Sequence, residues 1–247
     1  MIAQLRSELR KMRTTRTNAG LLLGLVALIL LAVIAGSFGS EAELALRENQ
    51  RDLVGNGAFA AVFAALIGVM AITSEFRHGT IRATFVFTPA RTLVVAAKML
   101  ASVVAGVVFG ALGSGLALGV GVLIIRVRGY DVLLDSGDVR RLLVGTVVMS
   151  ALWAALGVGL GALVRNQVFA IVGLFAWVFV VETIVVQYLP GAGRFAPGAA
   201  GAALTGDAVA DSSMHLLSAP VGGALLAAYA AAFVLLGALV TSRRDVT

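Results

Sequence analysis

A dense polar cluster directly follows a long apolar run at residues 75–82, with the sequence Glu75-Phe76-Arg77-His78-Gly79-Thr80-Ile81-Arg82. The next residues are Ala83–Phe87, so a short helix here would present Phe85 and Phe87 beside basic side chains. Aromatic and basic side chains on one projection suit docking onto a partner protein. The alternative is a loop whose cations only set the orientation of the chain in a membrane.

Glu182 is the only carboxylate within a predicted membrane span. Ionisable groups in spans are costly and normally face the protein interior or water. Glu182 lies about two helical turns before Pro190, where water or Arg194 could neutralise it. A relay for protons or cations is one interpretation, but a relay needs a chain of such groups. A structural or cavity-lining role is therefore favoured.

Other chemistry finds little support in the sequence. The chain has no cysteine, and its two histidines, His78 and His215, fall on opposite sides of the predicted membrane, which disfavours a metal site. A P-loop needs a Gly-Lys pair, whereas the two lysines follow Arg10 and Ala97. No Gly-x-Ser-x-Gly or His-Glu-x-x-His motif is present. We therefore predict no catalytic or metal-binding residue, and no cofactor on this chain.

The elements that must position these residues are apolar stretches long enough to cross a bilayer, which takes about 20 residues in a helix. With 60% hydrophobic residues and a mean hydropathy of +0.99, the composition excludes an ordinary soluble domain. We expect an all-α integral membrane protein with one domain, 1–247. Its predicted spans are 19–38, 54–73, 99–125, 142–163, 168–189 and 219–241.

The positive charges are unevenly distributed across these spans. Twelve of the 19 cationic side chains fall on the side of the two termini, and the other seven are diluted by acidic residues. The positive-inside rule therefore places both termini in the cytoplasm. The net charge of +6 is a topology signal and not an indication of nucleic-acid binding.

Two segments on the cytoplasmic side are predicted in more detail. Residues 1–17 carry apolar side chains at helical spacing opposite basic ones, which indicates an amphipathic helix on the membrane surface; the alternative is a disordered basic segment. The third apolar run, counted over 92–125, is about 51 Å long as a helix, against a hydrocarbon core of about 30 Å. Its first turns must project into the cytoplasm, where Lys98 can snorkel. Thr88-Pro89 marks its start, so 74–88 is a separate element.

Small residues and prolines suggest how the spans pack and connect. Glycines recur at four-residue spacing, which favours close helix packing, within one subunit or at a dimer seam. The pairs are Gly20/Gly24, Gly106/Gly110, Gly115/Gly119 and Gly157/Gly161. The segment 190–218 contains two prolines and apolar patches too short to cross. It is predicted as an extracellular loop or as a re-entrant segment in the outer leaflet.

The motif within 75–98 resembles the segment after the second span of ABC type-2 (ABC-2) transporter permeases. In the small bacterial members, a Glu, an aromatic and a basic residue precede Gly-Thr, and a Pro and a Lys follow. The matching residues here are Glu75, Phe76, Arg77, His78, Gly79, Thr80, Ile81, Phe85, Pro89, Arg91 and Lys98. The fifth-span region is also similar, through Trp177, Glu182, Pro190, Gly193, Arg194 and Pro197. Thr183 follows Glu182 where the family often has proline, which leaves the kink of this span in doubt.

The resemblance implies a role for each segment. Residues 1–17 would be a connecting helix, 74–88 a coupling helix in a groove of an ABC ATPase, and 190–218 re-entrant helices. The implied ATPase-coupling residues are Glu75, Phe76, Arg77, His78, Gly79, Thr80, Arg82 and Phe85, and the implied cavity residues are Trp177, Glu182 and Arg194. Two permease copies, as a homodimer, would pair with two ATPase subunits that hold ATP and Mg²⁺, in the bacterial inner membrane among its lipids. The complex would export an amphipathic drug, peptide or lipid-like substrate by alternating access.

Two other hypotheses stay open at this point. An ion-coupled secondary transporter would use Glu182 as its ion-responsive group, although inverted repeats and broken central helices are not evident. A non-transporting scaffold or immunity protein would use the same docking surface to bind an ATPase or a toxic peptide.

Overall fold

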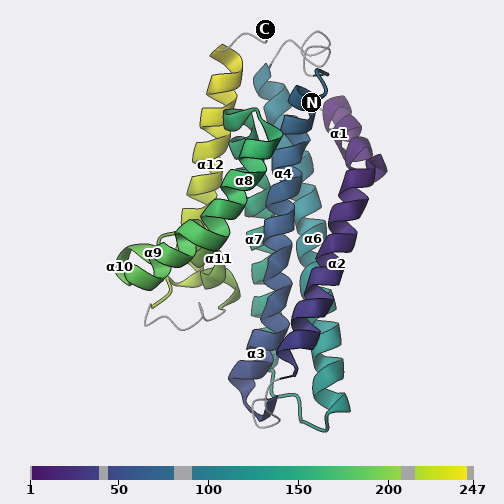
Figure 1. The fold of residues 1–247 in the computed structure, drawn as a ribbon, viewed down its shortest axis with the longest axis vertical. Coiled ribbons are helices and arrows are strands. Elements are labelled where there is room, and N and C mark those ends of the chain that lie inside the picture. Colours follow the sequence, from purple (N-terminus) through teal and green to yellow (C-terminus); the bar gives the residue numbers. More distant parts are fainter. Residues whose placement is uncertain (1, 39–43, 81–90, 207–214, 244–247) are drawn as a thin grey trace.

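The structure is a computed structural model that describes residues 2–38, 44–80, 91–206 and 215–243, and every regular element in these ranges is helical (Figure 1). Six segments are long and apolar enough to cross a membrane, which confirms the six predicted spans. They are Arg16–Gly36, Arg47–Arg77, Thr92–Val127, Ser136–Val164, Gln167–Tyr188 and Ala219–Thr241. The protein is therefore a multi-pass membrane protein.

Several segments are built from more than one helix. The described helices are α1 (Ile2–Thr14), α2 (Arg16–Gly36), α3 (Arg47–Gly55), α4 (Phe59–Arg77), α6 (Arg91–Val127), α7 (Ser136–Val164), α8 (Gln167–Ala176), α9 (Glu182–Tyr188), α10 (Pro190–Gly193), α11 (Pro197–Thr205) and α12 (Ala219–Arg243). A 3₁₀ turn, Asn56–Ala58, joins α3 to α4, and a π-helical turn, Trp177–Val181, joins α8 to α9. The second and fourth segments begin earlier than predicted because their first turns are polar and hydropathy alone does not detect them.

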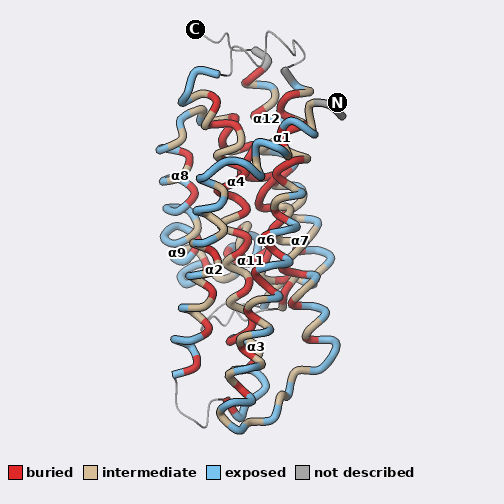
Figure 2. The backbone as a smooth tube through the Cα atoms, turned by 90° about the vertical axis from the view of Figure 1, so that its right-hand side faces the viewer, coloured by how far each residue is buried: buried red, intermediate tan, exposed pale blue. Residues whose placement is uncertain are grey.

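The centre of the bundle consists of α4, α6 and α7, and the buried residues concentrate along these helices (Figure 2). Two glycines let α4 and α7 approach closely, since a Cβ on Gly68 would overlap the carbonyl of Ala154 and one on Gly157 would overlap that of Ala65. Small residues permit such contact where no hydrophobic force drives helices together in lipid. Of the predicted pairs, Gly106/Gly110 and Gly157/Gly161 pack between helices of this chain, while Gly20, Gly115 and Gly119 face open space.

The bundle has two distinct ends (Figure 1). We call the end with α1 and the last turn of α12 the termini end, and the end with α3 the far end. At 37 residues, α6 is about 55 Å long, so it exceeds the hydrocarbon core as expected. The short helices α10 and α11 lie well short of the far end, and α11 packs against α7 and α12.

Candidate functional site

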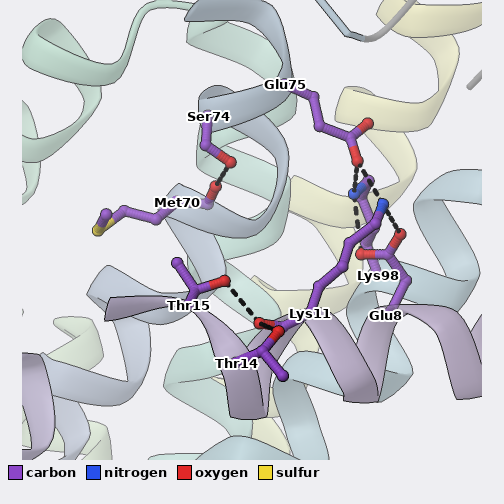
Figure 3. A network of polar contacts seen from close by, with 8 residues as sticks. All are labelled: Glu8, Lys11, Thr14, Thr15, Met70, Ser74, Glu75 and Lys98. Atoms are coloured by element: carbon purple, nitrogen blue, oxygen red, sulfur yellow. Dashed lines mark hydrogen bonds and ion pairs between the residues drawn. The ribbon is translucent and has the colours of Figure 1, made fainter. Parts of the chain in front are cut away.

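Two lysines and two glutamates from three helices meet at the termini end (Figure 3). Lys98 Nζ on α6 lies 2.7 Å from Glu75 Oε1 on α4 and 2.9 Å from Glu8 Oε2 on α1. Lys11 Nζ lies 2.8 Å from Glu8 Oε1 and 2.9 Å from Glu75 Oε1. This four-residue network joins α1, α4 and α6 and is electrically balanced.

Burial distinguishes the members of the network. The Lys98 side chain is 1% exposed and that of Glu8 is 3% exposed, whereas Lys11 is half-exposed. The prediction that Lys98 snorkels is therefore wrong: two carboxylates neutralise its charge inside the protein, so it has no need to reach water. Burial lowers the pKa of Lys11, but hydrogen bonds and the charges of Glu8 and Glu75 outweigh it and hold the pKa above its ordinary value.

Side-chain caps at the end of α1 hold this helix in place. Thr15 Oγ1 donates to the carbonyl of Lys11 at 2.5 Å, and Asn18 Nδ2 donates to that of Met12 at 2.9 Å. The bond from Asn18 reaches a carbonyl in the last turn of the helix, where intrahelical partners run out, and the carbonyl of Lys11 also accepts the backbone N–H of Thr15 at 3.0 Å. The chain bends at Thr15 into α2, and Glu8 faces α4 and α6. Residues Ile2–Thr14 are thus helical, as predicted, with Glu8 turned toward protein, and the location of this helix on a membrane surface stays a prediction.

The predicted coupling segment begins where α4 ends. Gly79 adopts a left-handed conformation with φ +68°, which favours glycine and turns the chain out of the helix. Arg77, His78, Gly79 and Thr80 are exposed, whereas Glu75 is buried in the network. Arg82 and Phe85 lie outside the described residues. The segment therefore has an exposed part and an anchored part.

Phe76 provides a second anchor for the same segment. The guanidinium of Arg165 lies 5.4 Å from the centre of the Phe76 ring, within the range of a cation–π contact. Arg165 Nη2 also donates to the carbonyl of Val240 on α12 at 2.8 Å. Through Glu75 and Phe76, the exposed segment is connected to α1, α6 and α12.

A cleft of about 640 Å³ lies beside the segment, lined by residues of α1, α2, α4, α6 and α8. Lys11, Arg77 and His78 contribute to its polar wall, and Met70 to its apolar wall. Arg77 Nη1 makes a long hydrogen bond of 3.4 Å to Gln167 Oε1 of α8, and His78 Nδ1 lies 2.8 Å from the carbonyl of Ser74. The exposed side chains of Lys11 and Arg77 give this side of the cleft positive charge that can meet an acidic surface.

The second predicted site is built around Glu182, which is buried. Its Oε2 accepts from Trp177 Nε1 at 3.2 Å, and its Oε1 accepts from the backbone N–H of Ala199 at 2.8 Å. A π-helical turn, Trp177–Val181, directly precedes Glu182, in the region where the missing proline had left the kink in doubt. Arg194 forms no ion pair with Glu182 in the part of the chain described; its guanidinium lies 4.8 Å from the ring centre of Phe195.

Charged side chains hold α11 at both ends. Glu182 lies at its first turn, and at its last turn Arg141 donates to the carbonyl of Ala203 and Arg51 to that of Gly206, each at 3.2 Å. An anion at the N-terminus and cations at the C-terminus complement the helix dipole. These contacts make Glu182 a positioning residue for α11.

Sequence reasoning missed Glu8 and Lys11, and it gave Lys98 the wrong surroundings. One signal was available, because Glu8 lies on the apolar face of a basic helix. Another was that the only two lysines of the chain, Lys11 and Lys98, fall in segments predicted on the same side of the membrane. Among the described residues, no group of three or more His, Asp or Glu is placed to hold a metal ion.

No model of a known protein family matches the chain, and no curated protein matches it significantly. The functional class therefore rests on the fold and on the two sites. They define a helical multi-pass membrane protein with an ion-pair network at the termini end and a carboxylate that positions a short internal helix.

Proposed function

We propose that this chain is the membrane subunit of an ATP-driven exporter, of the ABC type-2 permease kind, whose ATPase is a separate chain. In this proposal the termini end faces the cytoplasm, and the segment that begins at Arg77 docks onto the ATPase. Two copies of the chain pair with two ATPase subunits in the bacterial inner membrane. The substrate crosses by alternating access.

The observation that carries this proposal is the way the exposed segment is anchored. Arg77–Thr80 is exposed, and the two preceding residues are fixed to three other helices by the network and by Arg165. A force applied to the segment therefore acts on α1, α4, α6 and α12 together. A loop that only set the membrane topology would not need such anchors.

The surface charge supports the proposed orientation. Exposed cations at the termini end belong to α1, to the start of α2 and to the end of α4: Arg6, Arg10, Arg13, Arg16 and Arg77. Cations that flank spans favour the cytoplasmic side. The same charges suit an acidic groove on a partner.

The position of α10 and α11 supports a re-entrant segment. Both helices lie well short of the far end (Figure 1), and Ala199, Ala200 and Ala203 of α11 are buried against neighbouring helices. Irregular backbone at membrane depth is tolerated where protein covers it. We therefore propose that the chain dips into the outer leaflet here and returns through α12.

The exposed residue Arg77 provides the sharpest test. We expect the Arg77→Glu variant to insert and fold normally but to recover much less ATPase than the wild type on affinity purification in mild detergent. Glu75 is a poorer probe, because reversing its charge would also break the buried network. Mass spectrometry and ATP hydrolysis of the eluate measure the recovered ATPase.

Arg126→Glu is the matched control, since Arg126 is exposed at the opposite end of α6. It should recover as much ATPase as the wild type. If the wild-type protein recovers no ATPase under several detergent conditions, the proposal fails. If both variants recover as much as the wild type, docking does not involve Arg77.

The contacts of Glu182 do not favour the ion-coupled alternative. Its carboxylate already binds the α11 backbone and Trp177, and among the described residues it belongs to no group of three or more His, Asp or Glu placed to hold a cation. Transport by the purified protein in ATP-free liposomes under an ion gradient would reverse this preference.

A further inference from the structure

A second cavity lies within the bundle, away from the network. Its volume is about 440 Å³, and residues of α7, α8, α12 and the connection between α9 and α11 line it. Five aromatic side chains dominate its wall: Trp153, Trp177, Phe195, Tyr229 and Phe233. The volume falls within the usual range of small-molecule sites.

The wall offers a ligand few polar groups. The indole N–H of Trp153 is buried without a hydrogen-bond partner among the described residues and can donate one hydrogen bond, whereas the N–H and O–H of the other two polar wall residues are already used. Trp177 Nε1 already donates to Glu182, and the Tyr229 hydroxyl already donates to the carbonyl of Phe195 at 3.0 Å. None of the described residues that line the cavity is Asp, Glu, His, Lys or Arg. A charged ligand would lose its hydration without compensation, whereas an apolar ligand would gain from burial.

We propose that this cavity binds an uncharged apolar molecule that carries an aromatic ring. The five aromatic side chains in the wall can contact a ligand ring in stacked or edge-to-face geometry, and an acyl chain cannot make such contacts. Gly173 and Trp177 belong to the wall and are exposed, so the cavity is open on the α8 side. A molecule dissolved in the surrounding lipid can enter there.

The cavity is connected to the charged contacts that hold α11. Trp177 forms part of the wall and also bonds Glu182, which in turn holds the first turn of α11. Ala196 and Pro197, where α11 begins, form another part of the wall. A bound ring therefore contacts both the π-helical turn and the start of α11, and its presence stabilises their present arrangement.

The chain contains only two tryptophans, and both line the cavity, so their fluorescence reports on it directly. The Trp177→Phe variant leaves Trp153, which is 3% exposed, as the only tryptophan. The probe is 1-bromonaphthalene, titrated into this variant in nanodiscs of unbrominated phosphatidylcholine. We expect saturable quenching of Trp153, and excess unbrominated naphthalene should restore the emission.

Filling the cavity should prevent the quenching. A Cβ on Gly173 meets open space, so Gly173→Leu can enter the cavity without a backbone clash. In the Trp177→Phe background, we expect Gly173→Leu to weaken the apparent affinity of the protein for 1-bromonaphthalene roughly tenfold. The probe can then bind only if the added leucine side chain moves away or the cavity is overpacked. Gly115→Leu is the matched control, because Gly115 also faces open space but lies on α6 away from the cavity. It should leave the quenching curve unchanged.

Two results would overturn the inference. The first is quenching that rises linearly with the probe concentration, is not relieved by naphthalene and is equal in both glycine variants. This result would mean that the probe only partitions into lipid. Dibrominated phosphatidylcholine that quenches Trp153 as strongly, with relief by Gly173→Leu, would assign the cavity to an acyl chain. The competition by naphthalene needs no cavity variant, so it decides the matter even if Gly173→Leu does not fold. No ATPase or ATP is present, so failure here leaves the proposed function untouched.

Discussion

The two ends of the bundle both carry ion pairs, but the pairs differ in burial and in the number of helices they join. At the termini end, the four-residue network connects three helices and contains a lysine that is 1% exposed. At the far end, Arg47 pairs with Asp135 at 2.5 Å and with Asp138 at 2.6 Å, which connects α3 to the start of α7. There the Arg47 side chain is 50% exposed and that of Asp135 is 58% exposed, whereas Asp138 is buried and also pairs with Arg51 at 3.4 Å.

This difference in burial decides how much each cluster contributes to the stability of the fold. Exposed ion pairs are screened by water and typically contribute about 0–1 kcal/mol, whereas removing one partner of a buried pair costs about 3–5 kcal/mol because it leaves an unpaired buried charge. The termini end is therefore held more tightly than the far end, because only the termini end has a fully buried cation. A tightly fastened end is what transmission of force from a docked partner requires.

The largest expected effect comes from Lys98→Met. This change removes the buried lysine that pairs with Glu8 and Glu75, whereas their contacts with the half-exposed Lys11 remain. We expect a loss of about 3–5 kcal/mol, which corresponds to a fall in Tm on the order of 10 °C. Thermal unfolding of the purified protein in detergent, followed by size-exclusion chromatography, measures it.

The double variant Lys98→Met, Glu75→Gln tests the reason for this loss. It removes one charge of each sign and leaves Lys11 paired with Glu8, so much of the lost stability should return. Arg47→Met is the matched control at the far end and should cost less than Lys98→Met, because Arg47 is half-exposed and Arg51 still pairs with the buried Asp138. Equal losses in Lys98→Met and Arg47→Met would remove the contrast between the two ends.

The parts of the molecule that the sequence predicted are those that depend on local composition. Six spans follow from runs of apolar residues, whereas the polar first turns of α3 and α7 do not, because hydropathy averages treat them as loop. The four-residue network could not be predicted from the sequence, for a different reason. Its contacts connect residues 64 and 90 positions apart, and only tertiary packing decides that Lys98 meets carboxylates and not water. The π-helical turn at Trp177 likewise has no local signature comparable to proline.

A smaller effect is expected at Lys11, the exposed member of the network. Its pKa is raised above the ordinary 10.5 by Glu8 and Glu75 against the opposing effect of burial, so its contribution is fully present below the unfolded pKa. The contribution is lost as the pH rises through the folded pKa. The Tm difference between wild type and Lys11→Met should therefore be constant from neutral pH to about pH 10 and shrink above it. A difference that grows with alkaline pH would contradict the assigned partners.

The smallest effect is expected at Asp135, the N-cap of α7 at the far end. The backbone N–H of Asp138 donates to its side chain at 2.8 Å, and this bond, together with Arg47, holds the pKa of Asp135 below its ordinary 3.8. Its stabilising contribution is therefore present above the unfolded pKa and is lost as the pH falls through the lower folded pKa. Asp135→Ala should lower the Tm only slightly at pH 7, by an amount that shrinks on acidification below about pH 4. Asp135→Asn retains a capping oxygen and should lose less, since asparagine is as good an N-cap as aspartate. If Asp135→Ala lowers the Tm as much as Lys98→Met does, the contrast between the two ends is wrong. The exposed Asp135 would then contribute as much stability as the buried Lys98.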